Sequence, residues 1–225
     1  MRSQRVLMSG LVAVGLACLV GLTACGGYDD SGAHGDHGDD PLEPVEGIED
    51  IHGDDEPGQR VVGPDIVINE IMYNPASVRD EDGEWLELYN ASGETVDLLG
   101  WSLRDYGSNR HVIDESIVAE PGQYLVLGRS CDAGTNGGYV ADYCYGDEFK
   151  LANDPGDGVE LRDQDNTYVD SVSYDTHTPW PSNTPGTSIE LSDPAADNLE
   201  PASWTLAART YGAGDYGTPG LPNGR

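Results

Sequence analysis

Four carboxylates in the β-rich part of the chain are the side chains best suited to acid–base chemistry: Glu70, Glu84, Glu87 and Asp97. A pair of carboxyl groups flanking one bond is the arrangement that glycoside hydrolysis requires. All four stand in or beside predicted strands of a sandwich, and polar residues in such strands normally face solvent. We therefore expect these carboxylates on solvent-facing positions. A hydrolase with an unrecognised carboxylate site is the less favoured alternative.

Calcium is the cofactor that the loops could hold, because it takes several oxygen ligands from flexible, acidic loops. Three such loops contain the candidate ligands Asp80, Asp82, Asp154, Asp157, Asp163 and Asp165. None of the loops completes the EF-hand spacing, and Asp-Gly and Asp-Asn pairs are also typical of turns. Turn formation is the favoured interpretation. A calcium-dependent surface adhesin is an alternative function.

Neither the histidines nor the catalytic sequence motifs of known enzyme classes point to an enzyme. His111 and His177 have no companion at metal-ligand spacing, and the chain has neither a Gly-x-Ser-x-Gly nor a His-Glu-x-x-His motif. His34, His37 and His52 lie among aspartates and could bind a transition metal. A solvated acidic spacer explains these three histidines more simply, so we expect a protein without catalytic activity.

The N-terminus has the pattern of an export signal. Arg2 and Arg5 precede an apolar stretch over residues 6–23. The following Leu22-Thr23-Ala24-Cys25 resembles the bacterial lipobox. This resemblance implies that residues 1–24 are a lipoprotein signal peptide and that Cys25 carries the lipid that anchors the protein to a membrane. An uncleaved signal anchor and an ordinary signal peptide are the alternatives.

The lipobox resemblance also implies a location. Gly26, rather than Asp, follows the cysteine, which resembles an outer-membrane sorting signal in a bacterium with two membranes. We therefore expect an exported protein of the bacterial cell envelope, at the outer membrane or the cell surface.

The remaining cysteines indicate a disulfide. Cys18 leaves with the signal peptide and Cys25 takes the lipid, so that Cys131 and Cys144 remain. An even pair in an exported, oxidising context favours a disulfide between them. A metal-binding pair and free thiols are the alternatives.

Charge divides the chain and limits its partners. The formal net charge is −30, and residues 26–60 alone contain twelve Asp and Glu against one Arg. This composition cannot bury enough apolar surface to fold, so residues 25–64 are predicted to be a disordered acidic tether. So acidic a chain excludes nucleic-acid partners, whose binding depends on Lys and Arg.

From residue 65 onward the pattern is that of an all-β domain. Strands are predicted at 66–71, 84–89, 96–99, 101–103, 124–127, 158–161, 168–174 and 188–191. Turn residues separate them at short intervals, and no segment has a sustained helical face, as is typical of a β-sandwich. Trp85 and Trp101 are expected to fill the space between the two sheets, and Gly100 is expected at a bend.

The order of these segments is similar to that of the lamin tail domain, an immunoglobulin-like β-sandwich that occurs in nuclear lamins and in exported bacterial proteins. The resemblance is carried by residues 67–75, 84–90, 96–103, 121–127, 150–153, 158–161, 169–174, 186–191 and 217–223. Residues 130–145, which include the cysteine pair, are an insertion relative to that pattern. The resemblance covers most of residues 65–225 and implies an immunoglobulin-like fold for this part of the chain.

The resemblance and the N-terminal signal together predict a function. We expect a lipid-anchored envelope protein whose domain is a non-catalytic binding or structural module. Its partner would be an envelope protein or polymer, because the nucleic-acid contacts associated with lamins do not suit an exported chain of this charge.

Overall fold

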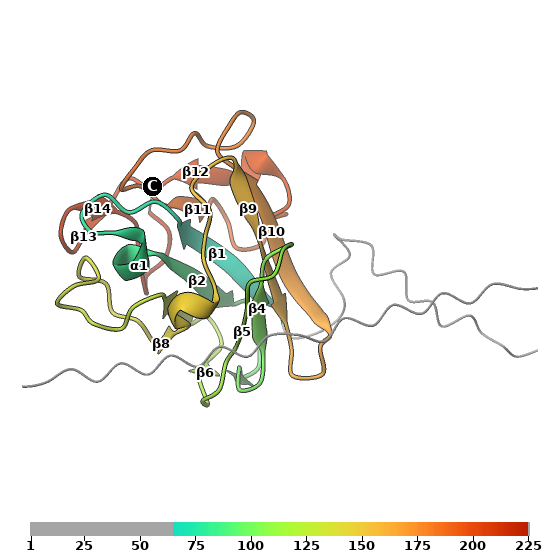
Figure 1. The fold of residues 1–225 in the computed structure, drawn as a ribbon. Helices are drawn as coiled ribbons and strands as arrows, with labels where there is room; N and C mark the ends of the chain where they lie inside the picture. The colour runs from blue at the N-terminus through green and yellow to red at the C-terminus, as the bar shows by residue number, and fades with distance from the viewer. Residues whose placement is uncertain (1–64, 225) are drawn as a thin grey trace, which may run out of the picture. The chain divides into compact units, whose positions relative to one another are not determined.

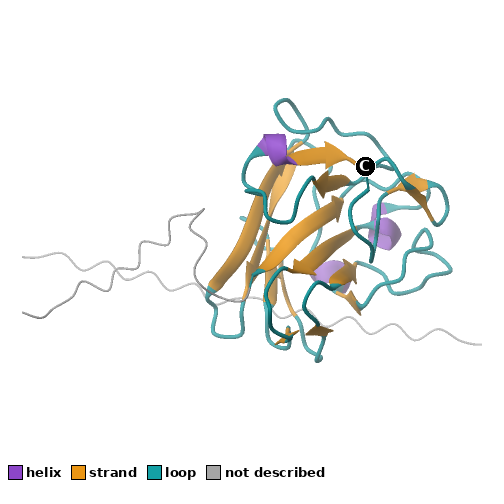
Figure 2. Ribbon diagram, turned by 180° about the vertical axis from the view of Figure 1, so that it is seen from behind, coloured by secondary structure: helices purple, strands orange, loops and turns teal. Residues whose placement is uncertain are grey.

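The computed structural model describes residues 65–224, so the predicted signal peptide, the lipid site at Cys25 and the acidic tether lie outside the described residues. Within the described residues, two β-sheets pack face to face around one hydrophobic core (Figure 1, and from behind in Figure 2). This is the β-sandwich that the sequence predicts. No helix in residues 65–224 is both long and apolar enough to cross a membrane.

The larger sheet has six strands in the order β12-β11-β1-β2-β7-β8. Its strands are β12 (Trp204–Leu206), β11 (Ile189–Leu191), β1 (Ile66–Met72), β2 (Trp85–Asn90), β7 (Tyr124–Gly128) and β8 (Tyr143–Cys144). All neighbours are antiparallel except β7 and β8, which are parallel. β1 and β2 therefore lie at the centre of the sheet, where each has a partner on both sides.

The smaller sheet has four antiparallel strands in the order β10-β9-β4-β5. Its strands are β10 (Tyr168–Asp175), β9 (Gly156–Arg162), β4 (Ser102–Arg104) and β5 (Arg110–Val112). Two short pairs, β3 (Val96–Asp97) with β6 (Val118–Ala119) and β13 (Thr210–Tyr211) with β14 (Asp215–Tyr216), complete the strands. The remaining elements are the one-turn helix α1 (Asp80–Gly83) and the 3-10 turns η1 (Gly146–Glu148) and η2 (Pro201–Ser203).

Alternation along the strands builds the core. Leu86 and Leu88 of β2 and Leu125 and Leu127 of β7 point inward, because residues two apart in a strand share one face. They meet apolar side chains of the smaller sheet, including Leu103. The core is therefore made of the apolar residues of the strands that the sequence predicts.

The predicted strands agree with the observed ones to within a few residues. The structure adds the short strands β5, β6, β8, β12, β13 and β14, whose segments lack a clear alternation in the sequence. Gly100 lies in the turn before β4 with φ +82°, a left-handed conformation that a residue without a Cβ adopts readily. The expectation of a bend at this glycine is confirmed.

Trp85 corrects one expectation. Trp101 belongs to the core between the sheets, but Trp85 lies on the opposite face of the six-stranded sheet. There it packs with Met72, Val126 and Tyr139 in a second, smaller cluster, and its indole N–H donates to Tyr211 Oη (3.0 Å). The outer face of this sheet is therefore a second buried layer.

Candidate functional site

Three of the four carboxylates singled out in the sequence are buried, which corrects the expectation that they face solvent. Glu70 and Glu87 have no exposed surface, and Glu84 is 2% exposed. Glu70 and Glu87 do lie on the face of the six-stranded sheet that points away from the core, as their alternation requires. Their burial arises because the C-terminal segment, residues 217–224, covers this face.

Glu70 fastens this segment to the sheet. Its Oε1 accepts hydrogen bonds from Ser188 Oγ (2.5 Å) and from the backbone N–H of Thr218 (2.9 Å). Its Oε2 accepts from Thr218 Oγ1 (2.7 Å). One carboxyl group thus joins β1, the loop before β11 and the C-terminal segment.

Glu87 makes a second attachment one strand away. Its Oε1 accepts from Asn69 Nδ2 (2.8 Å), and its Oε2 accepts from the backbone N–H of Gly220 (2.7 Å). Asn223 completes the contact, because its Nδ2 donates to the carbonyl oxygens of Asn69 (3.2 Å) and Leu191 (2.7 Å). The polar positions of β1 and β2 therefore bind the chain's own C-terminal segment.

The electrostatics of this pair follow from burial. Burial raises the pKa of Glu70 to about 7, although the hydrogen bonds from Ser188 and Thr218 oppose the rise. Burial, followed by the nearby charge of Glu70, raises the pKa of Glu87 to about 9. Glu190 lies directly opposite Glu70 on β11, and burial raises its pKa as well. With these pKa values Glu87, and in part Glu70, is protonated at neutral pH.

Access limits what these groups can do chemically. Three cavities flank the C-terminal segment, with volumes of about 200 Å³, 310 Å³ and 540 Å³. Glu190 lines the second of them, and none has Glu70 or Glu87 in its lining. Every oxygen of the two carboxyl groups accepts a hydrogen bond from the protein itself. The arrangement suits a structural attachment better than a site for a substrate.

Glu84 is engaged elsewhere. Its Oε2 accepts from Arg129 Nη1 (3.2 Å) and from the backbone N–H of Leu151 (3.3 Å). Burial raises the pKa of Glu84 to about 7, while the charge of Arg129 opposes the rise. Arg129 also pairs with the exposed Asp147 (2.8 Å). This ion pair ties the start of β2 to the loops around η1.

Asp97 is the one member of the group that lies where the sequence predicts, on an exposed position. Its Oδ1 accepts from the N–H of Leu99 (3.0 Å), and its Oδ2 accepts from Ser116 Oγ (2.8 Å). These hydrogen bonds lower its pKa. The side chain stabilises the turn between β3 and β4.

The calcium candidates are spread over separate turns, and five of the six accept hydrogen bonds from the protein. Asp163 Oδ1 accepts from the N–H groups of Asp165 and Thr167, and Asp157 Oδ2 accepts from that of Ala152. Asp154 Oδ1 accepts from Thr176 Oγ1. Asp80 accepts from Asn153 and Asp82 from Arg79. Within residues 65–224, no three His, Cys, Asp or Glu residues are grouped so that they could hold a metal ion; a calcium site stays a prediction.

Cys131 and Cys144 form the expected disulfide, with Cα atoms 5.7 Å apart. The loop between them lies against the outer face of the six-stranded sheet, where Tyr139 contacts Trp85 (ring centroids 6.1 Å apart). Tyr139 Oη also donates to the carbonyl oxygen of Ser130 (3.0 Å). The insertion therefore covers part of the second buried layer.

His111 belongs to a network that the sequence did not indicate. Its Nδ1 lies 2.9 Å from Glu148 Oε2, and its Nε2 lies 2.6 Å from Tyr143 Oη, which in turn donates to Asp114 Oδ1 (2.9 Å). The four residues come from two segments, residues 111–114 and 143–148, so only the fold brings them together. The network links β5 to the disulfide loop.

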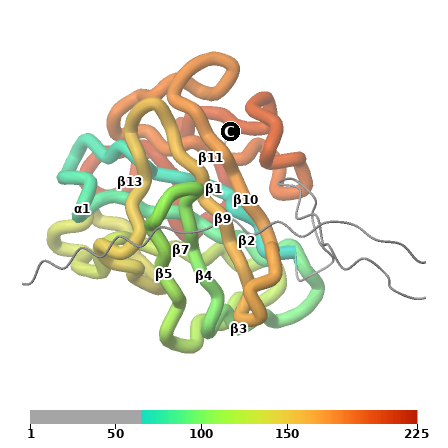
Figure 3. The backbone as a smooth tube through the Cα atoms, turned by 45° about the vertical axis from the view of Figure 1, so that its right-hand side comes forward, coloured from blue at the N-terminus to red at the C-terminus, as the bar shows by residue number. Residues whose placement is uncertain are grey.

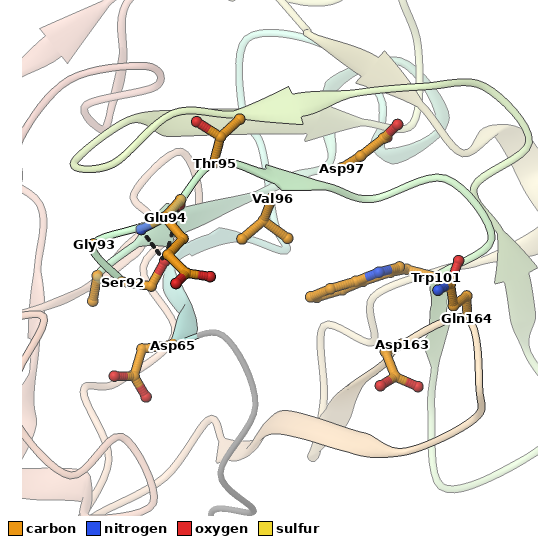
Figure 4. A pocket seen from close by; sticks show the side chains of 11 residues that line it. Asp65, Ser92, Gly93, Glu94, Thr95, Val96, Asp97, Trp101, Asp163 and Gln164 are labelled. Atoms are coloured by element: carbon orange, nitrogen blue, oxygen red, sulfur yellow. Dashed lines mark hydrogen bonds between the residues drawn. The ribbon is translucent and has the colours of Figure 1, made fainter.

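An open groove of about 770 Å³ lies beside Trp101 (Figure 4). Asp65, Glu94, Asp97 and Asp163 supply carboxylates to its lining, and Trp101 lies between the strand of Val96 and the turn of Asp163. Acidic and aromatic side chains together suit a cationic or hydrogen-bonding group. The sequence offered no signal for this groove because its lining comes from four separate segments.

Comparison with known proteins identifies a family. The model of the lamin tail domain matches residues 60–176, slightly more than half of the chain. This range contains both central strands of the six-stranded sheet and all of the four-stranded sheet, whereas β11, β12 and the C-terminal segment follow it. No curated protein matches the chain significantly.

Proposed function

Because the chain belongs to the lamin tail domain family, we propose that it acts as a binding module that is exported and held at the bacterial envelope by a lipid on Cys25. The family is one of immunoglobulin-like domains that are generally non-catalytic. The hydrogen bonds of the buried carboxylates support a non-catalytic role, because Glu70, Glu84 and Glu87 each hold parts of the fold together. A glycoside hydrolase that works with a carboxylate pair needs both groups at a substrate cavity.

The groove beside Trp101 is the binding surface that we propose for an envelope protein or polymer. It is concave and lined by several carboxylates, and the Trp101 ring, which is 4% exposed, forms part of its wall. A few polar groups in a concave surface are features of a binding site for a polar partner. The test compares capture from envelope extract by the full chain and by Glu94→Arg, which reverses a charge in the groove. Glu115→Arg is the matched control, since Glu115 is exposed and outside the groove lining.

The expected result is a partner that the wild type and Glu115→Arg retain and Glu94→Arg loses. Equal capture by all three proteins would place the binding surface elsewhere.

Lipid anchoring is tested by fractionation. Leu22-Thr23-Ala24-Cys25 supports it through its likeness to the lipobox. Cys25→Ser is expected to remove labelling by radioactive palmitate and to release the protein from the membrane fraction. Cys18→Ser is the control, because this cysteine lies in the same apolar stretch and should leave both properties unchanged. Labelling and fractionation of Cys25→Ser like those of the wild type would contradict the anchor.

A further inference from the structure

The outer face of the four-stranded sheet gathers three arginines. Seven Lys and Arg residues lie between residues 65 and 224: Arg79, Arg104, Arg110, Arg129, Lys150, Arg162 and Arg209. Arg104 and Arg110 are direct cross-strand partners on β4 and β5. Arg162 of β9 lies opposite Ser102 of β4. Ser102 and Arg104 are two residues apart in β4 and so share one face of the strand. β10, β9, β4 and β5 lie side by side in Figure 3.

This arrangement is unfavourable by itself, since like charges directly opposite each other destabilise a sheet. Burial and the charges of Arg110 and Arg162 lower the pKa of Arg104. Glu160 pairs with Arg162 at 2.5 Å, and both Arg104 and Arg162 also bond to Asn166. Arg110 is exposed and has no ion pair to another residue within 65–224. Three arginines thus lie close together on this face, with Glu160 beside them.

Two tyrosines complete the surface, which we call the arginine face: Arg104, Arg110, Arg162, Tyr106 and Tyr168. Tyr106 is 56% exposed and its ring lies directly on Gly158, where a Cβ would come within 2.1 Å of the ring. Tyr168 lies opposite Arg162 on β10. Arginine and tyrosine are the side chains that contribute most often to binding energy at protein interfaces.

The chain enters the domain close to this face. Asp65, the first described residue, lines the same groove as Asp163 and Gln164, which directly follow Arg162. The acidic run Asp54-Asp55-Glu56 ends nine residues before Asp65. Nine residues span up to about 30 Å when extended, which is enough to reach across a four-stranded sheet, whose strands are about 5 Å apart.

We propose that Asp54-Asp55-Glu56 docks on the arginine face. The guanidinium forks match carboxylates in a two-pronged geometry, and a short linker raises the effective concentration of the segment to the millimolar range. Any other anionic partner of this face has to compete with the chain's own segment. This inference goes beyond the proposed function and does not depend on the lipid or on the groove partner.

Zero-length cross-linking with a carbodiimide tests the proposal on the full chain. The chain has a single lysine, Lys150, so Arg110→Lys introduces a traceable amine at an exposed position. Arg79→Lys is the matched control, because Arg79 is exposed and already neighbours Glu81 and Asp82. A second control adds Asp54→Asn, Asp55→Asn and Glu56→Gln to Arg110→Lys. Lys150, which interacts with Asp147, reports that the reagent works in every sample.

The expected product is an intramolecular link from the introduced amine of Arg110→Lys to the peptide of Asp54–Glu56. The yield of this link should be several-fold higher than the yield of a link from Arg79→Lys to the same peptide. It should vanish when Asp54→Asn, Asp55→Asn and Glu56→Gln are added to Arg110→Lys. It should also fall at high salt, because salt screens exposed charges. Links found only between two chains would assign the face to a second copy and overturn the proposal. Equal links from both introduced amines, or none to Asp54–Glu56, would overturn it as well.

Discussion

Glu70 and Glu87 are direct cross-strand neighbours on β1 and β2, and the same C-terminal segment buries both carboxyl groups. Two ionised carboxylates in this arrangement would repel each other without solvent to screen them. The fold meets this difficulty with hydrogen-bond donors from Ser188, Thr218 and Gly220 and with raised pKa values. The pair therefore couples the attachment of the C-terminal segment to pH.

Glu87→Gln is expected to flatten the pH dependence of stability. Burial and Glu70 raise the pKa of Glu87 from 4.5 to about 9, so the folded state binds the proton more tightly than the unfolded chain. The stability that this group contributes is present below pH 4.5 and is lost as the pH rises to about 9. The glutamine amide stays neutral, and its N–H can donate to Asn69 Oδ1, which is buried without a partner.

Urea unfolding at intervals from pH 5 to pH 9 provides the measurement. The free energy of unfolding should fall with pH less steeply in Glu87→Gln than in the wild type. Glu94→Gln, at an exposed position, should retain the wild-type slope. Parallel profiles for Glu87→Gln and wild type would show that Glu87 does not titrate in this range.

Asn223→Ala tests the attachment of the C-terminal segment. It removes the donors to Asn69 O and Leu191 O and the acceptor of Asn69 Nδ2. Leaving such groups unpaired costs about 2–3 kcal/mol. Leu221→Ala in the same segment is the control, because Leu221 is 51% exposed and its truncation should cost less than about 0.5 kcal/mol. Equal unfolding midpoints for the two variants would contradict the role of Asn223.

Arg129→Met is expected to destabilise the fold more at high pH than at low pH. Glu84 is 2% exposed and loses its cation in this variant, which costs about 3 kcal/mol when the carboxylate is ionised. At pH 5 Glu84 can take up a proton, so the loss in free energy of unfolding relative to the wild type becomes smaller. Asp147→Asn removes the other partner of Arg129, but that side chain is 81% exposed, so its effect should stay below about 1 kcal/mol. A deficit independent of pH would argue against an ionised Glu84.

Removal of the disulfide is expected to lower stability by about 3 kcal/mol, because the bond closes a loop over a separation of 13 residues. The measurement is the unfolding free energy of the double variant Cys131→Ser with Cys144→Ser. A reductant should lower the stability of the wild type by a similar amount and leave the double variant unchanged. Wild-type stability that is insensitive to reductant, under conditions where free thiols appear, would contradict this expectation.

Local sequence predicted much of this fold because its signals are local. Alternation marked β2 and β10, β-rich composition marked β1, and turn residues separated the strands. Even the pairing of Cys131 with Cys144 followed from counting cysteines. The short strands β8 and β13 escaped prediction because two residues are too few to show a period.

The sequence by itself determined the longer strands, the family and the division of these strands into two faces. Only the tertiary structure decided that Glu70 and Glu87 are buried, since their covering segment ends near Asn223, more than a hundred residues later in the chain. Likewise, only strand pairing placed Arg104 opposite Arg110. Alternation shows that a side chain points away from the core, but burial depends on what packs there, and that is a property of contacts between distant segments.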